Sequence, residues 1–203
     1  MLVAEFDNIC LARGNKNIFS NFSFAVNEND KILIQGKSGI GKTTFFRILL
    51  GFQNVDSGRV RVNGLEMNRE NIRKIRSGIF YLSQDIDLRK EKFKDIFEEI
   101  FSFNNVKYSD RLEQTLSLLD LSGKIFDQNI KDLSGGERQR AGLLICFLLN
   151  RPVWLLDEPT SALDDDMKHR VADYILSRED NTVIIISHDE IWKKNNIIKI
   201  KRL

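Results

Sequence analysis

Residues 36–44 have the residue types and the spacing of a loop that holds phosphate groups. Gly36 and Gly41 are separated by four residues and are followed by Lys42 and Thr43, which is the phosphate-loop pattern. Backbone N–H groups of such a loop surround a polyphosphate, while the lysine reaches its terminal phosphates and the hydroxyl of Thr43 can hold Mg²⁺. The residues expected to contact the phosphates are Gly36, Lys37, Ser38, Gly39, Ile40, Gly41, Lys42, Thr43 and Thr44. The loop therefore predicts a nucleotide site.

The segments on either side of the loop agree with this prediction. Residues 31–35 have the apolar run of a buried strand, and residues 45–50 have the apolar spacing of a helix that Gly51 would end. We expect the helix to begin at Thr43, so that the partial positive charge of its N-terminus faces the bound phosphates.

A second chemical signal is an apolar strand that ends in two carboxylates. Residues 153–156 are apolar, and Asp157 and Glu158 follow them directly. Ligands of α/β sheets lie beyond the carboxyl ends of the strands, so Asp157 is placed to hold Mg²⁺ and Glu158 to polarise an attacking water. The alternative is that both acids cap a helix that begins near Pro159.

A third signal precedes the strongly helical run 138–149. Ser134 can cap this helix, and Gly135 and Gly136 leave the amides of its first turn uncovered. The result is either a plain helix cap or a second helix tip suited to phosphate. One nucleotide does not need two such tips from one chain.

Composition limits the classes of function. The chain has 203 residues and a net charge of +2 without a basic block, so charge gives no support for nucleic-acid binding. Cys10 and Cys146 lie in apolar stretches and are expected to be reduced core residues of a cytosolic protein. Neither a signal peptide nor an apolar run of about 20 residues is present, so any membrane role is expected to depend on a partner.

The pattern of apolar segments predicts an α/β fold with a mostly parallel sheet, an antiparallel β part and a helical insert. Predicted strands cover residues 3–6, 22–26, 32–35, 59–62, 79–82, 153–156 and 182–186, with a hairpin turn at Asn63-Gly64. Residues 86–138 form the expected helical insert, and residues 1–85 with 139–203 form the core and β part of one domain, 1–203. The aromatic series 93–103 is either helical core or a groove for a helix of another protein.

In their order along the chain these motifs resemble those of ATP-binding cassettes, the nucleotide-binding components of ABC transporters. The resemblance covers essentially the whole chain. It is carried by the phosphate loop, by Gln84, by residues 133–137, by the acidic strand with Glu158, and by the segment 161–164 with His188 after it. It implies a P-loop NTPase core.

The resemblance also implies that two copies of the chain pair head to tail in an ATP-dependent homodimer. Ser134, Gly135 and Gly136 of one copy would then contact the γ-phosphate of ATP bound to the other copy. Asp164 would link the two sites, and the symmetric interface would be isologous.

Several catalytic roles follow from the same resemblance. Gln84 would contact Mg²⁺ or the attacking water and sense a membrane partner. His188 would hydrogen-bond the γ-phosphate, Glu158 would assist the water, and Lys42 would hold the phosphates. The cofactors implied are ATP and Mg²⁺, with Thr43, Gln84 and Asp157 as the metal site.

The implied function is an ATPase subunit that drives transport through a separate integral membrane permease. Such a subunit lies in the cytoplasm, at the inner face of the cell membrane. The alternative is a soluble cassette, as in iron–sulfur cluster assembly. The layout of residues 161–170 is similar to that of small stand-alone cassettes associated with metal (iron) export.

Arg13 departs from the family pattern, because an aromatic residue usually stacks on adenine at this position. The guanidinium plane of Arg13 can stack in its place. The alternative is a solvated arginine in a turn.

Overall fold

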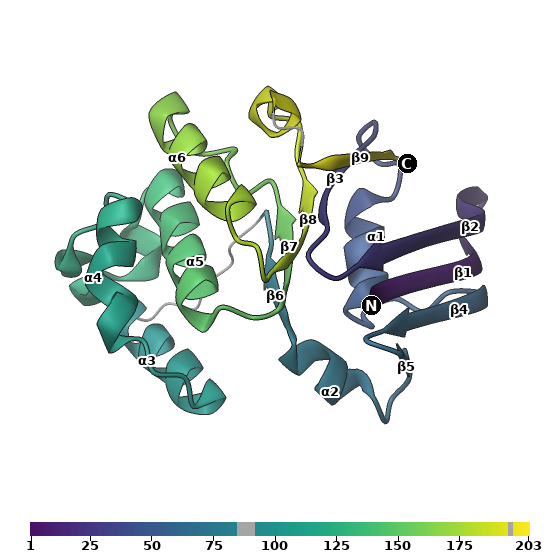
Figure 1. The fold of residues 1–203 in the computed structure, drawn as a ribbon, viewed down its shortest axis with the longest axis horizontal. Helices are drawn as coiled ribbons and strands as arrows, with labels where there is room; N and C mark the ends of the chain where they lie inside the picture. The colour runs from purple at the N-terminus through teal and green to yellow at the C-terminus, as the bar shows by residue number, and fades with distance from the viewer. Residues whose placement is uncertain (85–91, 195–196) are drawn as a thin grey trace.

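The computed structural model describes residues 1–84, 92–194 and 197–203, and the strands within them form two sheets (Figure 1). The larger sheet has the strand order β6-β7-β8-β3-β9, and all its neighbouring strands run parallel. Its strands are β3 (Lys31–Gln35), β6 (Ile79–Leu82), β7 (Val153–Asp157), β8 (Thr182–Ile186) and β9 (Lys199–Arg202). Their carboxyl ends meet at one edge, where ligands of such sheets bind.

Helices cover both faces of the parallel sheet. Helices α5 (Gly135–Leu149) and α6 (Asp165–Leu176) lie on one face and α1 (Lys42–Leu49) lies on the other (Figure 1). Along β7, Trp154 and Leu156 join the apolar cluster under α5, while Val153 and Leu155 join the cluster around α1. A strand buried on both faces must be apolar at every position, which is why the central strands were predictable.

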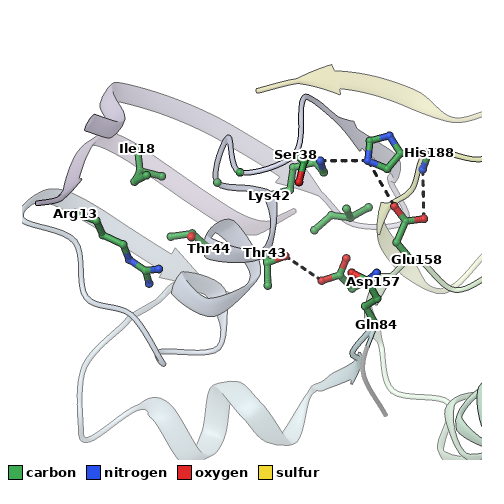
Figure 2. Close-up of a pocket in the computed structure, with 13 residues that line it drawn as sticks. Arg13, Ile18, Ser38, Lys42, Thr43, Thr44, Gln84, Asp157, Glu158 and His188 are labelled. Atoms are coloured by element: carbon green, nitrogen blue, oxygen red, sulfur yellow. Dashed lines mark hydrogen bonds and ion pairs between the residues drawn. The ribbon is translucent and has the colours of Figure 1, made fainter. Parts of the chain in front are cut away.

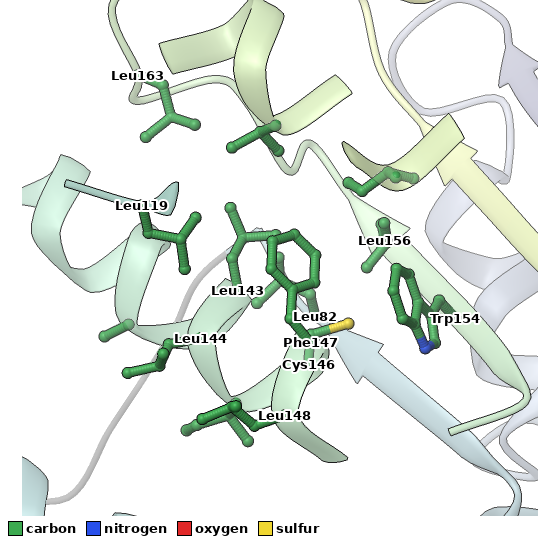
Figure 3. Close-up of a cluster of buried hydrophobic side chains, with 14 of the residues drawn as sticks. Leu82, Leu119, Leu143, Leu144, Cys146, Phe147, Leu148, Trp154, Leu156 and Leu163 are labelled. Atoms are coloured by element: carbon green, nitrogen blue, oxygen red, sulfur yellow. The ribbon is translucent and has the colours of Figure 1, made fainter. Parts of the chain in front are cut away.

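Helix α5 is the centre of the first cluster (Figure 3). Leu143, Leu144 and Leu148 have no exposed surface, and the ring of Phe147 lies 5.6 Å from that of Trp154. Residues 141–148 of α5 are all buried, as expected for a helical stretch that is apolar on every side. This packing fixes the position of the α5 N-terminus.

The smaller sheet is antiparallel, in the order β2-β1-β4-β5. Its strands are β1 (Leu2–Arg13), β2 (Lys16–Asn27), β4 (Ser57–Val62) and β5 (Leu65–Glu66). The predicted hairpin is present, with Asn63 at φ 50° and Gly64 at φ 73° between β4 and β5. Strands β1 and β2 are far longer than predicted, because Asn8 and Asn21 at φ 48° interrupt the apolar alternation without ending the pairing.

The stretch between β6 and α5 is helical where it is described. It contains α3 (Phe93–Asn104), α4 (Ser109–Leu118) and the 3₁₀ turns Gly123–Asp127 and Ile130–Asp132. Residues 86–91 of the predicted insert lie outside the described part of the chain. Two shorter elements, α2 (Ile72–Ser77) and the 3₁₀ turn Glu190–Lys194, complete the fold.

The aromatic series of α3 belongs mostly to the core. Phe93, Phe97 and Phe101 are buried, and the rings of Phe97 and Phe101 lie 4.4 Å apart. Phe103, in contrast, is 88% exposed, so the core interpretation fails for this residue.

The two cysteines differ. Cys146 is buried as predicted, whereas Cys10 is only partly buried and its Sγ contacts Asn21, so the assignment of Cys10 to the core is wrong. Within residues 1–84, 92–194 and 197–203, no helix is both long and apolar enough to cross a membrane.

Candidate functional site

A cavity of about 460 Å³ opens at the carboxyl edge of the parallel sheet (Figure 2). This volume suits a small-molecule ligand. The cavity is lined by Arg13, Ile18, Ser38, Gly39, Gly41, Lys42, Thr43, Thr44, Gln84, Asp157, Glu158, Ile186 and His188. Residues predicted from five separate parts of the sequence, namely Arg13, the phosphate loop, Gln84, the acidic pair and His188, therefore meet in one place.

The phosphate loop follows β3 and leads directly into α1. Gly41 caps this helix at φ 117°, and a Cβ atom there would come within 2.6 Å of Ile18 Cγ2. Both the backbone angle and the close contact require glycine. Because Gly41 is the cap, α1 begins at Lys42, one residue before the predicted Thr43.

The Lys42 ammonium lies inside the loop. Its Nζ donates hydrogen bonds to the carbonyl oxygens of Gly36 (2.7 Å) and Lys37 (3.3 Å), and it lies 3.4 Å from His188 Nε2. These carbonyls hold the positive charge at the cavity, where an anionic ligand can take over as its partner. The loop residues that do not line the cavity are Gly36, Lys37 and Ile40. They contribute to the conformation of the loop and not to the cavity wall.

Oxygen donors for a metal ion lie beside the loop. Thr43 Oγ1 donates to Asp157 Oδ2 at 3.3 Å, and the Asp157 residue is only 3% exposed. Gln84 lines the same cavity. A hydroxyl, a carboxylate and an amide oxygen are ligands that Mg²⁺ accepts, so these residues fit the metal.

Glu158 is held firmly at the end of β7. Its Oε2 accepts hydrogen bonds from Ser187 Oγ (2.9 Å) and from the His188 backbone N–H (3.3 Å), and its Oε1 lies 3.8 Å from His188 Nε2. The helix cap alternative is wrong, because the next helix, α6, begins only at Asp165. The carboxylate instead points into the cavity (Figure 2).

The tip of α5 lies outside this cavity. Ser134 Oγ accepts from the Glu137 N–H, and Glu137 Oε2 accepts from the Ser134 N–H at 2.8 Å, which is a capping box. Hydrogen bonding of the Glu137 carboxylate to the Ser134 backbone, and to a smaller extent to the Ser134 side chain, lowers the pKa of Glu137. None of Ser134, Gly135 and Gly136 lines the cavity.

Asp164 also lies away from the cavity. Its Oδ1 accepts a hydrogen bond of 2.9 Å from the Met167 N–H, so it caps α6. The structure thus brings the phosphate loop, Gln84, the acidic pair and His188 together, and leaves the α5 tip and Asp164 elsewhere on the surface.

Arg13 lines the cavity from the end of β1, where its Nη2 donates to Gln53 Oε1 at 2.8 Å. Arg13 is exposed and precedes the turn at residues 14–15, so stacking on adenine stays a prediction beside the solvated alternative.

Sequence reasoning missed several residues of the site. Ile18 and Ile186 add apolar surface to the cavity, and Lys16 Nζ donates to the Gly39 carbonyl at 2.8 Å. Ser187 was missed as well, although its place between an apolar strand and His188 is a signal that could have found it. Nothing in the sequence around Lys16 distinguishes it from an ordinary turn lysine.

Known proteins resemble this chain in sequence and in fold. A sequence profile described as "ABC transporter" matches residues 19–161. The "Probable ABC transporter ATP-binding protein p29" of Mycoplasma pneumoniae is 28% identical, over 92% of this chain and 82% of that protein. A "Putative ABC transporter ATP-binding protein" of Clostridium tetani is 30% identical, and the chain spans 41% of its length.

A solved structure shares the architecture. A dimeric ATP-binding cassette in a post-hydrolysis state, bound to ADP and Pi, has a TM-score of 0.83 at 21% identity, with 97% of this chain and 93% of that chain covered. The mixed arrangement of a parallel sheet, an antiparallel sheet and helices is therefore that of a P-loop ATPase cassette, as predicted. The chain belongs to the ABC transporter family and has the fold of an ATP-binding cassette.

Proposed function

We propose that this cassette works as the energy-supplying subunit of a transporter whose membrane-spanning part is a separate permease. The observation that carries the proposal is the meeting of Lys42, Thr43, Asp157 and Glu158 in one cavity. A cation, a hydroxyl and two acids around a glycine-rich loop are the groups needed to bind a nucleoside triphosphate and activate water against it.

Each of these residues has a role in the proposed reaction. The loop amides and Lys42 hold the phosphates, and the Glu158 carboxylate accepts a proton from the attacking water. His188 donates a hydrogen bond toward the terminal phosphate from its place beside Glu158. When Mg²⁺ is bound at Thr43, Asp157 and Gln84, it neutralises phosphate charge.

The position of the α5 tip supports a pair of copies. Ser134, Gly135 and Gly136 present helix amides that do not face their own cavity. In a two-fold pair they would face the nucleotide of the second copy, with Asp164 near the interface. Bound ATP then favours the closed pair, and hydrolysis removes that preference.

A cytoplasmic location at the inner face of the membrane follows from the permease partner. Both relatives described above carry transporter names, so the soluble alternative is not favoured. The permease can be tested directly. Reconstitution of the chain with a membrane protein encoded beside it should raise its ATPase rate, and an unchanged rate would argue against that pairing.

The substitution Glu158→Gln tests the chemistry. It keeps the size and hydrogen bonding of the side chain but removes the proton acceptor, so ATP should bind and turnover should fall by at least about a hundredfold. The variant should form an ATP-dependent dimer in size-exclusion chromatography with light scattering. Glu113→Gln, at an exposed position of α4, is the matched control. Normal turnover in Glu158→Gln would disprove the assigned base.

A further inference from the structure

The buried side chain of Gln139 connects α5 to the backbone of Glu158. Gln139 lies in the second turn of α5 and is 5% exposed. Its Nε2 donates to the Glu158 carbonyl oxygen at 2.6 Å, and its Oε1 accepts from the Ala162 N–H at 3.2 Å. Donor and acceptor ends of one amide therefore both bind the backbone of the segment 158–162.

The Glu158 backbone needs such support. Glu158 has φ 51°, in the left-handed region that residues with a side chain seldom adopt. Its N–H donates to the Ile186 carbonyl at 2.8 Å, which fixes one side of the residue. On the other side, its carbonyl accepts from Gln139 and from Ser161 Oγ at 3.1 Å. The direction of the carboxylate depends on this backbone conformation.

The first turn of α5 also packs on the same segment. A Cβ atom on Gly136 would lie 3.0 Å from the Ala162 carbonyl oxygen, so the two backbones are in close contact. Gly135 approaches the Ala162 side chain. The α5 tip, Ala162 and the Glu158 backbone are thus joined by packing and by the Gln139 amide.

We propose that Gln139 is a positioning residue, which holds the Glu158 carboxylate in its working direction and couples it to the α5 tip. This inference rests on the proposed function, in which Glu158 assists the water and the tip faces the nucleotide of a second copy. A contact at the α5 tip would then affect the position of the Glu158 carboxylate of the same chain through the side-chain amide of Gln139. The two nucleotide sites of a pair would in this way act together.

The first test is Gln139→Ala. The rate constant kcat should fall at least tenfold, because a small displacement of a catalytic group is costly, while KM for ATP should change less than twofold, because Gln139 does not line the cavity. Gln114→Ala, an exposed glutamine on α4, controls for the substitution itself. Cys146→Ala, buried on α5, controls for a loosened helix and should leave kcat within twofold. An unchanged kcat in Gln139→Ala would overturn the proposal.

A second variant separates positioning from packing. Gln139→Glu keeps the shape, but the new carboxyl can donate to the Glu158 carbonyl only when it is protonated. The ratio of variant to wild-type kcat should therefore rise as the pH falls from 8 to 6. A ratio that stays flat across this range, or a normal kcat at pH 8, would contradict the donated hydrogen bond.

The double variant Gln139→Ala/Glu158→Gln distinguishes the proposal from a role in pairing. It should still form the ATP-dependent dimer, because Gln139 positions the Glu158 side chain and does not itself contact the nucleotide of the second copy. Loss of that dimer would show that Gln139 supports the tip instead, and would overturn the proposal. If Glu158→Gln alone keeps turnover, the proposed function fails; if only Gln139→Ala keeps turnover, the function stands and this inference fails.

Discussion

The hydrogen bond from Ser187 Oγ to Glu158 Oε2 should be one of the stronger single interactions of the site. It is 2.9 Å long, Ser187 is 1% exposed and the Glu158 side chain is 11% exposed, so solvent screens it little. Hydrogen bonds to charged groups contribute about 1.5–3 kcal/mol to stability. Ser187→Ala should therefore lower the free energy of unfolding by about 1.5 kcal/mol or more. It should also reduce kcat, because the Glu158 carboxylate loses its shortest hydrogen bond.

A double-mutant cycle isolates this contribution. Ser187 Oγ also accepts from the Asp189 N–H, and this second loss occurs in both backgrounds, so it cancels in the cycle. With Glu158→Gln as the second change, a neutral hydrogen bond of about 0.5–1.5 kcal/mol replaces the charged one. The expected coupling is therefore about 1 kcal/mol or more.

Urea unfolding followed by tryptophan fluorescence measures the cycle. Trp154 and Trp192 are both fully buried and should report loss of the core. Ser177→Ala, at an exposed serine that ends α6, is the matched control and should change stability by less than about 0.5 kcal/mol. A coupling near zero, together with normal kcat in Ser187→Ala, would refute the view that Ser187 holds the base.

Three further changes test other parts of the site. Gly41→Ala places a Cβ atom 2.6 Å from Ile18 at φ 117° and should weaken ATP binding by about tenfold or more, measured by titration with a fluorescent nucleotide; unchanged affinity would contradict the required backbone. Arg13→Ala should weaken ATP binding severalfold and reduce the preference for ATP over GTP, and an unchanged preference in competition titrations would mean that Arg13 does not contact the base. Because hydrogen bonds from Ser134 lower the pKa of Glu137, they stabilise the protein above the ordinary carboxyl pKa of about 4.3, and this gain is lost as the pH falls through the lowered value. In urea unfolding, the stability difference between wild type and Glu137→Gln should accordingly shrink from pH 6 toward pH 3, and a constant difference would contradict the capping role.

Much of the fold and the chemistry could be predicted because each signal is local. The glycine spacing of the loop, the apolar runs of β7 and β8, and the Asn63-Gly64 turn each depend on neighbouring residues only. Burial on both faces leaves a continuous apolar run, and a strand that ends in acids places them at the ligand edge. These predictions needed no knowledge of distant contacts.

What escaped prediction depends on contacts between distant segments. Gln139 and Glu158 are adjacent only because α5 packs beside the end of β7, and the left-handed backbone of Glu158 has no sequence signal. The length of β1 and β2 was missed for a related reason, because asparagines at positive φ are typical of turns as well as of bulged strands. In both cases pairing across the fold outweighs the local preference.

The rigidity of α5 limits where its tip can act. For Ser134 to reach its own cavity, the helix would have to leave its place, and Leu143, Leu144 and Leu148 would lose their burial. Each buried leucine contributes about 1.5–3 kcal/mol, so this movement costs about 5–9 kcal/mol, a large part of the stability of a typical domain. Closure of one chain on its own nucleotide is therefore far more costly than the approach of a second chain with its core intact. The packing of α5 favours a phosphate ligand brought to the tip by another copy.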